Sequence, residues 1–300
     1  MAGAHDTGGP FGRMLTAMVT PFTPSGELDV DGAQRLATHL VDSGNDGLVI
    51  SGTTGESPTT SDDEKERLLR AVVEAVGDRA HVVAGAGTND TVHTLRLARL
   101  AETAGADGVL VVTPYYNKPP QAGLLAHFRA AADATGLPVM LYDIPGRSGV
   151  PIATETLLAL AEHPRIVAVK DAKGDLFAGS RVIAETDLAY YSGDDVLNLP
   201  WLSVGAVGFA SVAGHVIAGD LAAMIHAHVS GDVTKALEIH QRTIPAVRGI
   251  MTHTQGCIAS KAVLHRLGLP AGPVRLPYVD ADADTVAAIR ADLAIAGITI

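Results

Sequence analysis

Residues 47–86, GLVISGTTGESPTTSDDEKERLLRAVVEAVGDRAHVVAGA, decide the fold that this sequence predicts. The stretch begins and ends with short apolar runs, 47–50 and 81–86, which are typical of buried parallel strands. Between them, 61–76 has the spacing of an amphipathic helix, and Ser61 stands in the capping position. A strand, a helix and a second strand in this order predict a parallel pair joined by a right-handed crossover.

The same alternation of apolar runs and helical patterns continues along most of the chain. Eight strand and helix pairs in about 230 residues predict a (β/α)₈ barrel, the TIM barrel of the α/β class. An open doubly wound sheet is the alternative. No Gly-x-Gly-x-x-Gly follows the first strand and no Gly-x4-Gly-Lys occurs, so neither a dinucleotide site nor a phosphate loop has support. The expected strands are 15–20, 47–50, 81–86, 108–113, 138–143, 166–171, 189–192 and 208–212, and the expected helices include 29–43, 61–76, 91–104, 121–134 and 154–162.

The sequence divides into three predicted parts. Residues 1–12 are Gly-rich and polar, without the basic start and apolar centre of a signal peptide, and we expect a flexible N-terminal tail. Residues 13–230 are expected to form the catalytic barrel. Strand patterns then stop, and 231–300 predict a C-terminal helical domain with helices near 232–251, 258–267 and 281–296.

Composition limits the classes of function. The 300 residues are 47% hydrophobic, enough for a large core, and the net charge of −11 argues against a broad basic face for nucleic acid. The longest weakly polar stretch, 204–219, is shorter than the ~20 apolar residues of a membrane helix, so we expect no membrane partner. The single cysteine, Cys257, excludes an internal disulfide and is expected to be a small buried hydrophobe; this usage fits a reducing cytoplasm, where we expect the protein.

Polar residues gather where the predicted strands end, and chemistry in a barrel of this kind occurs at those ends. No pair of histidines with ligand spacing joins them, because His226 and His228 lie two apart on a predicted helix, where side chains diverge. We therefore expect no catalytic metal. The polar runs are 51–57, 113–117, 142–147, 170–171 and 192–195.

Lys170 follows the apolar run 166–169 and so lies at the mouth of a predicted buried strand. A solvated lysine at the end of a strand is one interpretation. The other is a desolvated, neutral amine that attacks a carbonyl, which requires its pKa to fall from ~10.4 to roughly 7 or 8.

The neighbouring polar residues also have two interpretations each. The Gly-bracketed Thr53-Thr54 turn either holds an anionic group on hydroxyls and backbone N–H groups or only caps the next helix. Tyr142 is either a packed strand end or a proton relay, and Arg147 is either a surface residue or a carboxylate binder. Together with Lys170, they predict a Schiff-base enzyme for a 2-oxo acid, which needs no metal or organic cofactor.

Five motifs stand in order along the predicted barrel: TAMVTPF at 16–22, GTTGES at 52–57, Tyr115-Tyr116, YDIPGRSG at 142–149 and VKD at 169–171. They resemble the dihydrodipicolinate synthase family of pyruvate-dependent class I aldolases. The resemblance implies a (β/α)₈ lyase, usually a homotetramer built as a dimer of dimers. It implies condensation of pyruvate with L-aspartate 4-semialdehyde to 4-hydroxy-tetrahydrodipicolinate, on the route to diaminopimelate and lysine, through a covalent imine and without a cofactor.

The resemblance also implies roles for individual residues. Lys170 resembles the lysine that forms the imine, and Tyr142 the proton donor and acceptor beside it. Thr53 would link Tyr142 to Tyr116, the tyrosine that in the family reaches into the neighbouring site across a tight dimer interface. The implied substrate contacts are Thr54 for the pyruvate carboxylate, Arg147 for the semialdehyde carboxylate, the Gly193 backbone near the bound substrate and Ala210 over the pyruvate methyl group.

Three departures limit this transfer. Ala210 replaces a larger aliphatic residue, which predicts a roomier pocket. The stretch 256–261, GCIASK, differs from the Asn-Pro-x-Pro-x-Lys of many relatives. The contact that this C-terminal stretch makes in those relatives therefore stays an open question here. The third concerns the site that binds lysine in inhibited members, and it predicts weak or absent inhibition by L-lysine. There Ser57, Asn89 and Tyr115 fit, whereas Asp62, Lys65 and His93 replace two histidines and a glutamate.

Two other functions stay open at this point. A lyase for N-acetylneuraminate or a 2-oxo-3-deoxy sugar acid would share Lys170 and Tyr142, although the sialic acid enzymes typically have Ser-Thr in the turn at 53–54 and lack Arg147. A non-catalytic 2-oxo acid sensor would have no need for Tyr142 and Tyr116 together.

Overall fold

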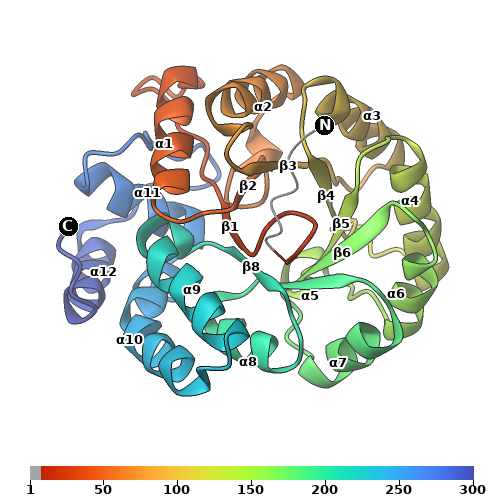
Figure 1. The fold of residues 1–300 in the computed structure, drawn as a ribbon. Helices are drawn as coiled ribbons and strands as arrows, with labels where there is room; N and C mark the ends of the chain where they lie inside the picture. Colours follow the sequence, from red (N-terminus) through yellow and green to blue (C-terminus); the bar gives the residue numbers. More distant parts are fainter. Residues whose placement is uncertain (1–7) are drawn as a thin grey trace.

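Eight parallel strands close into a barrel in the computed structural model, which describes residues 8–300 (Figure 1). They are β1 (Met14–Ala17), β2 (Gly47–Ile50), β3 (His81–Gly85), β4 (Gly108–Val112), β5 (Val139–Asp143), β6 (Ile166–Asp171), β7 (Ala189–Ser192) and β8 (Gly208–Ser211). The strands pair in chain order, and β8 returns to β1 with Phe209 opposite Met14. This closure confirms the predicted (β/α)₈ barrel and excludes the open sheet.

Helices accompany the strands, and most of them surround the barrel on its outside (Figure 1). They are α1 (Val30–Asp42), α2 (Asp62–Val76), α3 (Thr91–Thr103), α4 (Gln121–Asp133), α5 (Pro145–Ser148), α6 (Thr154–Ala161), α7 (Leu176–Glu185), α8 (Asn198–Ser203), α9 (Gly214–Val229), α10 (Val233–Met251), α11 (Gly256–Arg266) and α12 (Ala283–Ile295). Capping side chains set several of the starts: Asp29 caps α1, and Ser61 forms a capping box with Glu64 at the start of α2. His226 and His228 lie on α9, as expected.

Two apolar layers stabilise the barrel. Leu15, Met140 and Ala168 belong to the cluster that fills its interior, whereas Phe128 and Trp201 belong to the larger core between strands and helices. Strands β2 to β7 contribute to both layers, because successive side chains point to opposite faces. Several predicted strands are one to three residues too long at the carboxyl end, since the chain there already turns into the loops of the barrel mouth.

The N-terminal end of the barrel is closed by part of the predicted tail. Phe11 is fully buried in the inner cluster, and its ring contacts the backbone position of Gly108, where an added Cβ would lie 2.3 Å from the ring. The hydroxyl of Tyr191 donates to the carbonyl of Gly12 at 2.8 Å. The prediction of a flexible tail over 1–12 is therefore wrong at its last residues, while 1–7 lie outside the described residues.

The C-terminal helices pack on one side of the barrel. Helices α10, α11 and α12 confirm the three predicted helices, and they share an apolar cluster with α9, Met14 and Phe209. The predicted boundary at 230–231 falls in the turn between α9 and α10, and a separate domain over 231–300 stays a prediction. Within residues 8–300, no helix has both the length and the apolar character needed to cross a membrane.

We expect Phe11→Ala to lower the free energy of unfolding by about 3–5 kcal/mol, because it removes a fully buried ring and leaves a cavity. The midpoint of urea unfolding followed by circular dichroism measures this change. Val233→Ala, at an exposed position, is the control and should change the stability by less than about 0.5 kcal/mol. Equal midpoints for the two variants would show that the buried Phe11 ring does not contribute to the stability of the barrel.

Candidate active site

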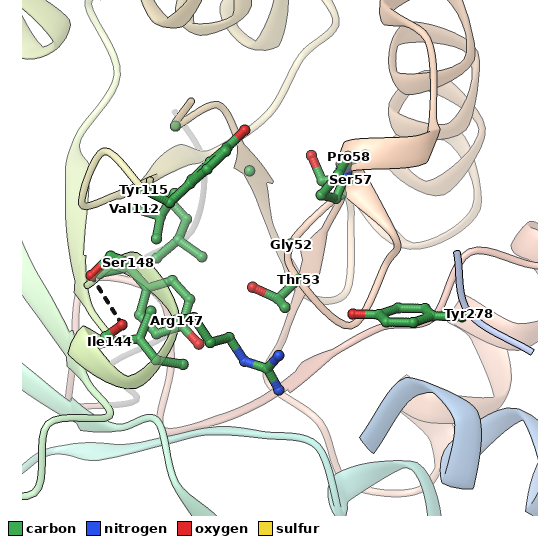
Figure 2. Close-up of a pocket in the computed structure, with 15 residues that line it drawn as sticks. Gly52, Thr53, Ser57, Pro58, Val112, Tyr115, Ile144, Arg147, Ser148 and Tyr278 are labelled. Carbon is green, nitrogen blue, oxygen red and sulfur yellow. Dashed lines mark hydrogen bonds between the residues drawn. The ribbon is translucent and has the colours of Figure 1, made fainter. Parts of the chain in front are cut away.

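A cavity of about 230 Å³ opens at the carboxyl ends of β2 to β5 (Figure 2). Most of its wall comes from the loops at these strand ends, as the (β/α)₈ fold leads one to expect. The polar side chains that line it are Ser51, Thr53, Ser57, Tyr115, Tyr142, Arg147, Ser148 and Tyr278.

Lys170 lies next to this cavity on β6, in register with Tyr142 on β5. Its side chain is 4% exposed, and its Nζ is 4.4 Å from the centroid of the Tyr142 ring. Burial lowers the pKa of the amine to about 8; Asp195 opposes this shift, and Arg147 adds to it. The predicted desolvated amine thus agrees with the geometry, and a solvated strand end does not.

Tyr142 has the complementary ionisation. Burial raises the pKa of its phenol to about 12, against the smaller lowering effects of Arg147 and of a hydrogen bond with Thr53. At neutral pH the phenol is therefore protonated and able to donate a proton beside an amine that is able to lose one.

The turn that carries Thr53 and Thr54 is tightly constrained. Thr54 is buried, and an added Cβ at Gly85 would lie 2.3 Å from the carbonyl oxygen of Ser51, so glycine is required where the end of β3 passes the start of this turn. Glu56 adopts a left-handed conformation with φ of 55°, which is uncommon for a residue with a side chain. The turn therefore needs contacts from elsewhere to hold this shape.

Those contacts come from the C-terminal part of the chain. The carboxylate of Glu56 is 1% exposed and pairs with Lys261 of α11 at 2.6 Å. Its other oxygen accepts from the backbone N–H of Arg275 at 2.8 Å. The altered stretch 256–261 thus keeps a lysine contact to the turn, and Cys257 is buried beside it as expected, with its Sγ 3.6 Å from Glu56 Oε1.

The remaining predicted site residues differ in position. Arg147 lies on α5, and Figure 2 shows its guanidinium directed into the cavity. Gly193 leaves room for the aliphatic part of the Lys170 side chain, since an added Cβ would lie 2.9 Å from Lys170 Cγ. Ala210 is fully buried in the inner cluster with Tyr142.

Tyr116 does not reach the cavity within one chain. Its side chain is 88% exposed, and its backbone has a left-handed φ of 77°. Of the predicted effector residues, Ser57 and Tyr115 line the cavity, whereas Asn89 is exposed on the loop after β3 and its carbonyl accepts from Asn117. A role for Tyr116 across an interface between two chains stays a prediction.

Two features of the site have no counterpart in the sequence prediction. Asp195 acts to raise the pKa of Lys170 against the effect of burial, although the sequence marks only the polar run 192–195. Tyr278 lines the cavity from a segment distant in the chain, where no periodic pattern in the sequence points to it. Among residues 8–300, no three His, Cys, Asp or Glu side chains come together in an arrangement able to hold a metal ion.

Comparison with known proteins agrees with this geometry. Residues 10–296 match the model of the dihydrodipicolinate synthetase family. The chain belongs to this family. It is 67% identical to 4-hydroxy-tetrahydrodipicolinate synthase 2 of Streptomyces coelicolor over 97% of both chains, and 68% identical to the synthase of Acidothermus cellulolyticus over 97% of this chain and 94% of the relative. Among solved structures, the dihydrodipicolinate synthase of Cyanidioschyzon merolae with lysine bound has a TM-score of 0.93 and 44% identity, covering 96% of this chain and 99% of that one.

We expect the reaction of Lys170 with a small acylating reagent, acetic anhydride, to speed up as the pH rises to about 8 and then to level off. The neutral amine is the nucleophile, so below the pKa the rate should fall about tenfold per pH unit. Peptide mass mapping between about pH 6 and pH 10 measures the profile, with Nα-acetyl-lysine as reference. A Lys170 profile that coincides with the reference would show that burial does not lower its pKa.

Proposed function

We propose that this chain is a 4-hydroxy-tetrahydrodipicolinate synthase, a lyase that condenses pyruvate with L-aspartate 4-semialdehyde. The observation that carries the proposal is the buried, low-pKa Lys170 beside the protonated Tyr142, at a cavity that also presents Arg147. The names of the relatives that are 67% and 68% identical over nearly the whole chain support the same activity.

The first step is the formation of an imine on Lys170. The neutral amine adds to the ketone carbon of pyruvate, and the carbinolamine loses water to leave a C=N bond, with Tyr142 as the source of the proton that the departing oxygen needs. The Thr53-Thr54 turn holds the carboxylate of pyruvate, Thr54 by its hydroxyl and the turn by its backbone N–H groups. Gly193 leaves space for the lysine, and Ala210 lies where the methyl group would pack. No cofactor enters this step.

The second step joins the two substrates. The iminium makes the methyl group acidic, and loss of a proton gives an enamine whose carbon attacks the aldehyde of L-aspartate 4-semialdehyde. Arg147 binds the carboxylate of this substrate, and Thr53 relays protons between Tyr142 and Tyr116. The amino group of the second substrate then adds to the imine carbon, displaces Lys170 and closes the ring, which frees the enzyme for another cycle.

The alternatives account less well for the same cavity. A lyase for N-acetylneuraminate or a 2-oxo-3-deoxy sugar acid has no use for a second carboxylate binder, which Arg147 provides here. A 2-oxo acid sensor requires neither a lowered lysine pKa nor a proton donor beside it.

Several finer points are part of the proposal. The tetramer, a dimer of dimers, would bring Tyr116 of one chain to the site of another, which accounts for an exposed tyrosine held in a left-handed conformation. The cytoplasmic location, the absence of nucleic acid partners and the division at 230–231 likewise stay predictions from the sequence.

We expect pyruvate and borohydride together to attach a pyruvate-derived group to Lys170, because the reductant traps the imine. Peptide mass mapping locates the group, and Lys170→Met, which keeps the length of the side chain without the amine, is the control.

A second measurement compares the aldehydes that accept the pyruvate carbon: aspartate semialdehyde, N-acetylmannosamine and glyceraldehyde. An unmodified Lys170 would rule out the mechanism, whereas preference for a sugar aldehyde would rule out only the assigned substrate.

We expect L-lysine to inhibit weakly or not at all. At the predicted effector site, Asp62 accepts from His93 at 3.0 Å and pairs with Arg96, while Lys65 is buried and donates to the Thr60 carbonyl, which leaves a cation where a cationic effector would bind. Steady-state rates with added L-lysine measure this. The triple variant Asp62→His, Lys65→His, His93→Glu is the comparison and should become sensitive; micromolar inhibition of the unaltered enzyme would contradict the prediction.

A further inference from the structure

One wall of the cavity is not made by the barrel. Tyr278 belongs to the segment between α11 and α12, yet it lines the same cavity as Thr53 and Arg147. Figure 2 shows its hydroxyl directed into the cavity, toward the side on which Thr53 and the guanidinium of Arg147 lie. The ring packs against the larger core between strands and helices, and its hydroxyl end is directed into the cavity.

Arg275 holds this tyrosine in place. The backbone N–H of Tyr278 donates to the carbonyl of Arg275 at 3.0 Å. The Arg275 guanidinium pairs with Glu64 at 2.6 Å, donates to the carbonyl of Thr59 at 2.9 Å and lies 4.0 Å from the centre of the Phe22 ring.

The same segment is fixed to the turn that is proposed to hold pyruvate. The backbone N–H of Arg275 donates to Glu56, and Glu56 is part of the turn that carries Thr53 and Thr54. Two hydrogen bonds of the Arg275 backbone, one to Tyr278 and one to Glu56, therefore link the segment that carries the Tyr278 hydroxyl to this turn.

The chemistry of the two facing groups suits an anionic ligand. Burial raises the pKa of Tyr278, against a smaller lowering effect of Arg147, so its phenol is a hydrogen-bond donor at neutral pH. Arg147 presents a permanent positive charge to the same space. A guanidinium and a phenol donor on opposite sides match the two oxygens of one carboxylate.

We propose that Tyr278 is a specificity-determining residue for the second substrate, whose carboxylate accepts a hydrogen bond from the Tyr278 hydroxyl while Arg147 binds its other oxygen. The inference rests on the proposed function, because pyruvate is placed deeper, at Lys170. An aldehyde that carries a carboxylate gains this charge-assisted bond, and a sugar aldehyde without one does not.

Tyr278→Phe tests the hydroxyl alone, since the ring and its packing remain. We expect the KM for aspartate semialdehyde to rise about tenfold, with the KM for pyruvate and the borohydride-trapped adduct on Lys170 changed by less than about twofold. The preference for aspartate semialdehyde over glyceraldehyde, expressed as a ratio of kcat/KM values, should fall by a similar factor. A residue that only stabilises the fold would not change that ratio.

Val279→Ala is the matched control, because this neighbouring side chain is 66% exposed and does not line the cavity; we expect it to behave as the unaltered enzyme. An unchanged semialdehyde KM in Tyr278→Phe would overturn the inference, and so would an equal rise in the KM for both substrates. If the unaltered enzyme forms no adduct on Lys170, the proposed function fails and the inference fails with it. If the adduct forms but Tyr278→Phe leaves the semialdehyde KM unchanged, only the inference fails.

Discussion

The site depends on the removal of one amine from water. Lys170 and Tyr142 are adjacent across β5 and β6, and the same burial acts on both in opposite directions. It lowers the pKa of the amine to about 8 and raises that of the phenol to about 12, because the charged form is disfavoured in each case. One dry environment thus supplies a nucleophile and a proton donor at the same pH. The apolar interior of the barrel, with Met140 and Ala168 on the same strands, keeps this environment dry.

A buried ion pair connects the barrel mouth to the C-terminal helices. Glu56 and Lys261 are 1% and 2% exposed, and such pairs contribute little net stability because both charges lose their hydration. Here the pair has a geometric consequence. The contact with Lys261 holds Glu56 in its left-handed conformation, and the hydrogen bond from Arg275 to Glu56 positions the segment that carries Tyr278. The helices that come after the barrel therefore act as a support for the substrate turn.

Much of this arrangement was accessible from the sequence, for physical reasons that also explain the exceptions. The strands are local apolar runs, and a barrel brings the residues at their carboxyl ends together, so Lys170, Tyr142, Thr53 and Arg147 were predictable at one mouth. Phe11 was not, because a single aromatic in a Gly-rich stretch has no period. Tyr278 was not either, since its position depends on Arg275 and on Glu56, which lies 219 residues before Arg275. Tyr116 stays a prediction, because its proposed partner is another chain.

Strand alternation also explains how a lysine followed directly by an acid keeps a low pKa. Asp171 points to the opposite face of β6, where it accepts from the backbone N–H groups of Lys173 and Gly174 at 2.9 and 2.8 Å. The acid that does act on Lys170 is Asp195, and its effect opposes the shift without cancelling it. Its carboxylate accepts from four donors, namely the side chains of Asn198 and Ser211 and the backbone N–H groups of Val212 and Ala213. These hydrogen bonds connect the residues after β7 to the end of β8, while burial remains the larger effect on the pKa of the amine.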